Sequence, residues 1–268
     1  MSIQSDFVKQ VVDKIKDDQN VLGLGVAGSW ITGEIDSYSD VDLVLVTTER
    51  VAPNREQMVA YANQFGDLLN NFTGEHVGEP RLLICLYNNP LVHVDIKFLV
   101  KEEFYTRVED PFIAWERQGA LSSILASTKS EWPKIDYQWI EDRFWTWVHY
   151  IAAKIGRGEN FEALESLSFI RANVTAPLLQ IKSGKLPRGL RKVEASFAQG
   201  DVQKLAATVP EYSTKSIIRA LLQTIDLYQQ LRTELYPYSV VLHEKTQATV
   251  LEYLELISRR ALNSNDRS

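Results

Sequence analysis

The residues of this 268-residue chain whose types and spacing could do chemistry are a pair of aspartates and a glycine-serine turn before them. Asp40 and Asp42 flank a single valine, and ten residues separate them from Gly28-Ser29. Residues i and i+2 of a strand point to the same face, so both carboxylates would project together. They repel each other unless a cation lies between them, and hard divalent Mg²⁺ is the usual solution. A glycine-serine turn can bring backbone N–H groups and a hydroxyl close to phosphate oxygens.

Asp95 supplies a third carboxylate inside the apolar run 91–98, where an unpaired charge is costly. His93 lies two residues earlier on the same face, and a lone strand histidine is more typical of a structural role. Lys97, two residues later, could be the charge partner of Asp95. The aspartate pair alone would favour a solvated strand entrance. The third carboxylate and the upstream turn shift the prediction to a site for metal ions and phosphate.

Hydrophobic spacing predicts a mixed α/β arrangement for the first hundred residues and helices in the second half. In the first part we expect helices at 3–18 and 54–72 and strands at 21–27, 41–47, 81–87 and 91–100, with a tight connection at 88–90. The segment 101–137 is the candidate connector. From about residue 138 apolar side chains repeat at three and four residues, and further helices are expected at 160–182, 214–235 and 239–262.

The charge balance is acidic, with 35 Asp and Glu against 29 Lys and Arg and a net charge of -6. This argues against non-specific nucleic-acid binding, which depends on basic residues. Hydrophobic residues make up 45% and charged residues 24%, which is typical of soluble domains and excludes disordered, collagen and coiled-coil classes.

One cysteine, Cys85, cannot form an internal disulfide, and its apolar surroundings indicate a buried thiol rather than a nucleophile. The first residues lack the cationic and apolar regions of a signal peptide, and no apolar stretch approaches the length of a membrane span. We therefore expect a cytoplasmic protein without membrane contact.

The segment 23–28 matches the dinucleotide pattern G-x-G-x-x-G. A dinucleotide fold needs a helix after the third glycine and a ribose-binding acid at the end of the next strand. Too few residues separate Gly28 from Asp40 for a crossover helix, and Asp40 and Asp42 stand at the start of their strand. The pattern therefore favours the acidic site over dinucleotide binding.

The combination of Gly28-Ser29, Asp40-x-Asp42 and Asp95 resembles the signature of the polymerase-beta-like nucleotidyltransferase superfamily. The segments 144–151, 154–159 and 165–171 resemble the helical domain of bacterial aminoglycoside 6-adenylyltransferases. Overall length and layout also resemble those of lincosamide nucleotidyltransferases. The resemblance covers most of residues 15–185. It implies an α+β fold, with a nucleotidyltransferase α/β domain built on a mixed sheet at 1–135 and an all-helical bundle domain at 136–268.

The resemblance also implies roles for the N-terminal residues. Gly28 and Ser29 would contact the triphosphate of ATP, and Asp40 and Asp42 would bind two Mg²⁺ ions. Asp95 would complete the metal site or act as the base that takes the proton of the acceptor. These residues are the expected catalytic and metal-binding set.

In the helical domain, Lys154 and Arg157 share a helix face and could reach a triphosphate, or they could be solvated cations near a helix C-terminus. Glu141 and Asp142 are alternative candidates for the base. For both acids, a solvated position in the first turn of a helix, where the helix dipole favours acids, is the better interpretation.

The expected activity is Mg²⁺-dependent transfer of AMP from ATP to a hydroxyl of a small antibiotic-like acceptor, of aminoglycoside or lincosamide type, with release of pyrophosphate. The expected partners are a nucleotide and this acceptor, with no nucleic acid, and related enzymes occur as monomers and homodimers. The alternatives are a nucleotidyltransferase that modifies a protein partner, a catalytically silent nucleotide-binding regulatory module and, more distantly, a dinucleotide oxidoreductase.

Overall fold

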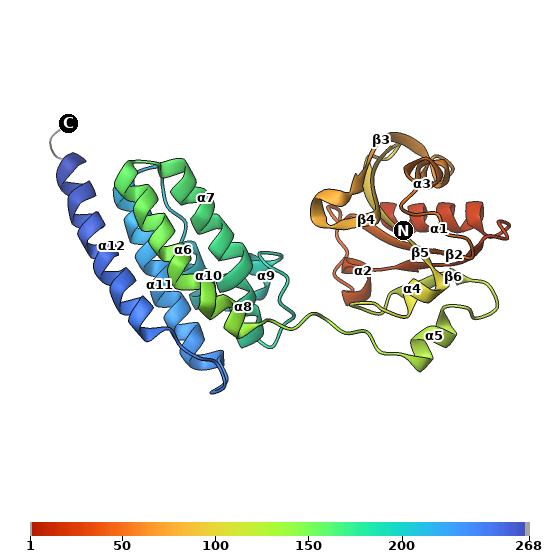
Figure 1. Ribbon diagram of the computed structural model, residues 1–268. Helices are drawn as coiled ribbons and strands as arrows, with labels where there is room; N and C mark the ends of the chain where they lie inside the picture. The colour runs from red at the N-terminus through yellow and green to blue at the C-terminus, as the bar shows by residue number, and fades with distance from the viewer. Residues whose placement is uncertain (1, 266–268) are drawn as a thin grey trace. The chain divides into compact units, whose positions relative to one another are not determined.

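The computed structural model describes residues 2–265 and divides the chain into two compact units, Met1–Pro133 and Lys134–Ser268. The boundary expected between residues 135 and 136 lies two residues further along. Each unit has a hydrophobic core of its own. In Figure 1 the first unit runs from red to yellow-green and the second from green to blue.

Six strands form one mixed sheet in the first unit, in the order β3-β4-β5-β2-β1-β6. They are β1 (Val21–Val26), β2 (Val41–Thr47), β3 (Asp67–Gly74), β4 (Glu79–Asn88), β5 (Val92–Val100) and β6 (Phe112–Glu116). β2 and β5 are parallel, and the other neighbouring pairs are antiparallel. The predicted mixed sheet is confirmed.

Helices cover the two faces of this sheet unequally. α1 (Ile3–Ile15) and α3 (Arg55–Ala62) contribute to the larger core on one face. The short helices α4 (Lys101–Phe104) and α5 (Ser122–Ser127) contribute to a smaller cluster on the other face. Figure 1 shows these two pairs on opposite sides of the strands. The second face therefore has the smaller buried apolar cluster.

The helix predicted over 54–72 is wrong in its second half. α3 ends at Ala62, and Asp67–Gly74 forms β3, followed by a 3₁₀ turn at Glu75–Val77. The apolar residues between 58 and 69 fit helical spacing, but the backbone after Gly66 pairs with β4, with Leu68 opposite Tyr87. Pairing with a neighbouring strand thus outweighs the local pattern.

The expected connector 101–137 is also more structured than predicted. It contains α4, α5 and the edge strand β6, which pairs with β1 directly after Pro111. Cys85 conforms to its prediction, because it is buried in β4 and burial raises the pKa of its thiol to about 12. An unreactive thiol follows from that environment.

The described part of the second unit contains helices and loops and no strand. Its helices are α6 (Tyr137–Arg157), α7 (Asn160–Ile170), α8 (Ala176–Lys182), α9 (Val193–Ser196), α10 (Gln199–Ala206), α11 (Thr214–Leu235) and α12 (Glu244–Asn265). A π-helical turn, Arg171–Thr175, joins α7 to α8. The long helices α6, α11 and α12 lie side by side (Figure 1). The α+β fold class is confirmed. The helices α9 and α10 were not predicted from the sequence.

Within residues 2–265, every helix is too short or too polar to cross a membrane.

Candidate active site

Asp42 and Asp95 are neighbours across two parallel strands. Asp42 of β2 is the register partner of Asp95 of β5, and the adjacent Val41 and Val94 are buried. Side chains alternate along a strand, so the two carboxylates project from the face opposite the valines. Adjacent strands lie about 4.8 Å apart, which places both carboxylates within reach of one small ligand.

Asp40, directly before β2, lies close enough to Asp95 to act on its carboxyl group. Burial raises the pKa of Asp95, and the negative charge of Asp40 raises it further, while His93 opposes both effects. A carboxyl group loses its proton less readily beside a carboxylate, which explains why Asp40 raises the pKa of Asp95. Asp95 is thus the register partner of Asp42 and lies within the electrostatic range of Asp40.

His93 is the hydrogen-bond partner of Asp95. Its Nε2 lies 2.9 Å from Asp95 Oδ1. Lys97, the partner considered from the sequence, instead places its Nζ 2.8 Å from Glu79 Oε2. The contact with His93 holds one oxygen of Asp95 and leaves Oδ2 for other ligands.

The glycine-serine turn lies against Asp42. Gly28 has a φ of 64°, in the left-handed region, and precedes the four-residue helix α2 (Ser29–Thr32). The N–H of Ala27 donates to the carbonyl oxygen of Asp42 at 2.8 Å. A Cβ at Gly28 would lie only 1.8 Å from Asp42 Oδ2. Only glycine fits this close approach between turn and carboxylate.

Gly28→Ala is therefore expected to displace the Asp42 carboxylate and to lower the free energy of unfolding by about 2–4 kcal/mol, through the left-handed φ and the clash. Urea denaturation of the purified variant measures this loss. Gly33→Ala is the matched control, since Gly33 has a φ of 67° and no atom within 4 Å of its would-be Cβ. Equal losses for the two variants would contradict the close packing of Gly28 on Asp42.

A fourth carboxylate, which the sequence patterns did not single out, reaches the same turn. Oε1 of Glu109 accepts a hydrogen bond from the N–H of Gly28 at 3.3 Å. Glu109 lies between α4 and β6, in the segment expected to be a connector. The two residues are 81 positions apart, so no local spacing could have indicated the contact.

The dinucleotide pattern at 23–28 does not form a dinucleotide-binding unit. β1 and β2 are antiparallel neighbours, and only the four residues of α2 follow Gly28 as a helix. A dinucleotide fold requires parallel strands joined by a crossover helix. The structure therefore contradicts the dinucleotide alternative, and the acidic site stays a prediction.

The oxygen donors of this region suit a hard divalent cation in their chemistry. Asp40, Asp42 and Asp95 repel one another, and a cation between them would relieve that repulsion. Among residues 2–265, however, no three His, Cys, Asp or Glu side chains are gathered closely enough to hold a metal ion. The carboxylates are chemically suitable ligands, but their side chains are not arranged as a complete metal-binding site.

Lys154 and Arg157 lie in the last turn of α6. The Nζ of Lys154 lies 2.7 Å from Glu159 Oε2 and 2.9 Å from Glu162 Oε2, and these bonds raise the pKa of Lys154. The Arg157 side chain is 67% exposed and lies 3.8 Å from Glu159. The role of both residues in nucleotide binding stays a prediction. To bind a phosphate, Lys154 would have to give up its contacts with Glu159 and Glu162.

Glu141 is neither a solvated first-turn residue nor a base open to an acceptor. Its side chain is 0% exposed, in the second turn of α6. The donors to its two oxygens are Arg232, the hydroxyl of Tyr228, the indole N–H of Trp145 and the backbone N–H of His243. Asp142 is exposed and contacts the imidazole of His243. Both interpretations of Glu141 are corrected to a buried structural ion pair.

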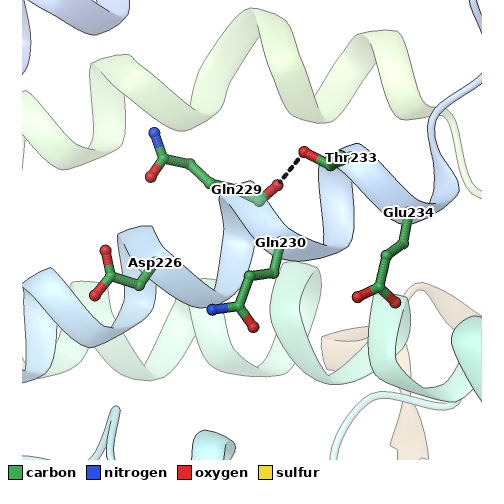
Figure 2. A pocket seen from close by; sticks show the side chains of 5 residues that line it. All are labelled: Asp226, Gln229, Gln230, Thr233 and Glu234. Atoms are coloured by element: carbon green, nitrogen blue, oxygen red, sulfur yellow. Dashed lines mark hydrogen bonds between the residues drawn. The ribbon is translucent and has the colours of Figure 1, made fainter.

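A shallow pocket of about 440 Å³ lies on α11 (Figure 2). It is lined by Asp226, Gln229, Gln230, Thr233 and Glu234. Several of these side chains have protein partners: Thr233 donates to the carbonyl oxygen of Gln229, Gln230 accepts from Lys204, and Glu234 pairs with Lys182. None of the predicted site residues lines this pocket.

No protein-family model matches the chain, and no curated protein matches it. Among solved structures, it is similar to an aminoglycoside 6-adenyltransferase from Bacillus subtilis, with 12% identity, a TM-score of 0.42 and coverage of 96% of this chain and 99% of that one. A nucleotidyltransferase-like protein from Exiguobacterium sibiricum matches with 11% identity, a TM-score of 0.36 and coverage of 97% and 91%.

A spectinomycin adenyltransferase from Enterococcus faecialis, solved with ATP and spectinomycin, matches with 11% identity, a TM-score of 0.33 and coverage of 95% of this chain and 98% of that one. At such identities and TM-scores, these similarities assign no role to any residue of this chain.

Proposed function

We propose that this protein is a Mg²⁺-dependent nucleotidyltransferase that moves AMP from ATP to a hydroxyl of a small antibiotic-like acceptor and releases pyrophosphate. The observation that carries the proposal is the register pairing of Asp42 with Asp95, with Asp40 beside them and the Gly28 turn packed on Asp42. An aminoglycoside acceptor is supported by the resemblance of the segments 144–151, 154–159 and 165–171, and a lincosamide acceptor by the resemblance in overall length and layout.

In this proposal Asp40, Asp42 and Asp95 would hold two Mg²⁺ ions. Bound Mg²⁺ would supply neutralisation of the triphosphate charge. The N–H of Gly28 and the hydroxyl of Ser29 would bind phosphate oxygens. Lys154 and Arg157 of α6 are proposed as further nucleotide-binding residues on the resemblance of their segment alone.

The acceptor hydroxyl oxygen forms a bond to the α-phosphorus of ATP, and the bond from that phosphorus to the bridging oxygen breaks, so pyrophosphate leaves with the bond's electron pair. Asp95 receives the hydroxyl proton, with His93 fixing its Oδ1. Catalysis of this kind rests mainly on positioning and charge stabilisation, which rigid neighbouring strands provide.

The test is incubation of the purified chain with ATP, Mg²⁺ and a panel of aminoglycosides and lincosamides. Pyrophosphate release that requires both an acceptor and Mg²⁺, with an AMP adduct of the drug in the mass spectrum, would support the proposal. No release with any acceptor contradicts the acceptor class. Labelled AMP on a lysate polypeptide would then favour protein modification, and ATP binding without turnover would favour a regulatory module.

A further inference from the structure

The carboxylate of Glu109 contacts the Gly28 turn. Its Oε1 accepts the N–H of Gly28 at 3.3 Å. The neighbouring residues anchor the segment that carries it. Arg107 bonds Asp110 at 2.6 Å and the hydroxyl and carbonyl oxygens of Thr128. Glu109 is thus presented by an anchored backbone rather than by a loose loop.

The buried Pro111 anchors the other side of Glu109 against β1. A Cβ at Gly25 would lie 3.0 Å from the Pro111 ring, so the proline packs directly on the strand that leads into the Gly28 turn. Glu109 and the turn are therefore held together by backbone packing as well as by their hydrogen bond.

The N–H of Gly28 is also the donor that the proposed function assigns to a phosphate oxygen. Carboxylate and phosphate oxygens are both acceptors, and a single N–H forms one strong hydrogen bond at a time. A phosphate that binds this N–H must therefore displace Glu109 or share the donor with it.

Electrostatic repulsion adds to this competition. The Gly28 turn packs on Asp42, so an anion at the turn approaches the charges of both Asp42 and Glu109. Like charges a few ångströms apart in a partly buried site repel strongly, and a divalent cation removes much of that repulsion. The free site should therefore bind a metal-free triphosphate weakly and a triphosphate in complex with a divalent cation more tightly.

We propose that Glu109 is a specificity-determining residue that occupies the Gly28 N–H in the free protein and makes nucleotide binding depend on a divalent cation. The inference rests on the proposed function, because it takes the Gly28 turn as the place of the triphosphate. Glu109 selects the metal complex of the nucleotide over the free anion.

The experiment compares the wild type with Glu109→Gln, which keeps the shape of the side chain and removes its charge. Calorimetry measures the Kd of ATP in EDTA and in excess Mg²⁺. We expect Glu109→Gln to lower the Kd in EDTA about tenfold and the Kd with Mg²⁺ less than about threefold. The matched control is Glu102→Gln, an exposed acid on α4 whose replacement removes the same charge and should change neither Kd.

The amide signal of Gly28 in ¹⁵N-labelled protein gives a readout that needs no nucleotide. It should shift in Glu109→Gln, and tripolyphosphate without metal should shift it further in the variant than in the wild type. An unchanged Gly28 signal, or equal Kd values in EDTA for wild type and variant, overturns the proposal. Normal ATP binding by Glu109→Gln with lost AMP transfer also overturns it, since Glu109 would then be catalytic.

The two proposals fail in different ways. A wild type that binds ATP with Mg²⁺ but transfers no AMP contradicts the proposed function and leaves the Glu109 comparison measurable. A protein that transfers AMP but whose Glu109→Gln variant gains no affinity in EDTA contradicts only the role of Glu109. A wild type that binds no ATP in either condition overturns both.

Discussion

Asp42→Asn is expected to lower kcat/KM for AMP transfer by at least about a thousandfold, or about 4 kcal/mol of transition-state stabilisation. Asparagine keeps the volume of the side chain and the packing of the Gly28 turn. It removes one of the negative charges that would hold a divalent cation, and a neutral amide is a much weaker ligand for a hard ion. Steady-state pyrophosphate release at saturating ATP and Mg²⁺, with the acceptor concentration varied, measures the loss in kcat/KM for the acceptor.

The control for Asp42→Asn is Asp17→Asn, which changes an exposed acid after α1 and should leave the rate unchanged. Asp40→Asn should lose activity as Asp42→Asn does, and it should also lower the pKa of Asp95, because Asp40 raises that pKa. Thermal melting of each variant tests for an intact fold. Activity retained in both site variants would contradict the metal-binding roles.

Elements with one buried face were predictable from the sequence. The strand expected at 41–47 and the helix expected at 214–235 coincide with β2 and α11. In both, burial follows the period of the element, so the apolar pattern records which side faces the core. The pair Asp40 and Asp42, at the start of β2, could be predicted from the sequence for the same reason.

In the edge strands β3 and β6, the apolar pattern of the sequence does not indicate which side of the strand is buried. In β3, Leu69 is 52% and Phe72 47% exposed, so their hydrophobicity does not report burial and their spacing imitates a helix. β6 is the opposite edge of the sheet and is held by its pairing with β1. Backbone pairing between distant segments leaves little trace in the side-chain pattern.

The candidate site divides in the same way. Asp40 and Asp42 belong to one local pattern, and the parallel register that brings Asp95 beside Asp42 required the fold. The contact of Glu109 with Gly28 joins distant segments and has no sequence signature. Spacing can predict which acids share a face, but only tertiary structure shows which group occupies the turn.

Glu141→Ala is expected to lower the free energy of unfolding of the helical unit by about 3–5 kcal/mol, because it leaves the guanidinium of Arg232 buried without its carboxylate. Glu141 Oε1 lies 3.2 Å from Arg232 and accepts the backbone N–H of His243 at 3.0 Å, which joins α6, α11 and the start of α12. Urea denaturation followed by fluorescence reports the loss, since Trp145 donates to Glu141. The transitions of the two units are fitted separately, because they need not coincide.

Asp142→Ala tests the same helix one residue along. The Asp142 side chain is 44% exposed, and its contact with His243 should contribute less than about 1 kcal/mol. If burial of the ion pair causes the loss, Arg232→Ala added to Glu141→Ala should cost far less than Arg232→Ala alone, because each substitution removes the partner that the other leaves behind. Additive losses, or a Glu141→Ala variant as stable as Asp142→Ala, would show that the helices are held by their apolar core and that this buried carboxylate is replaceable.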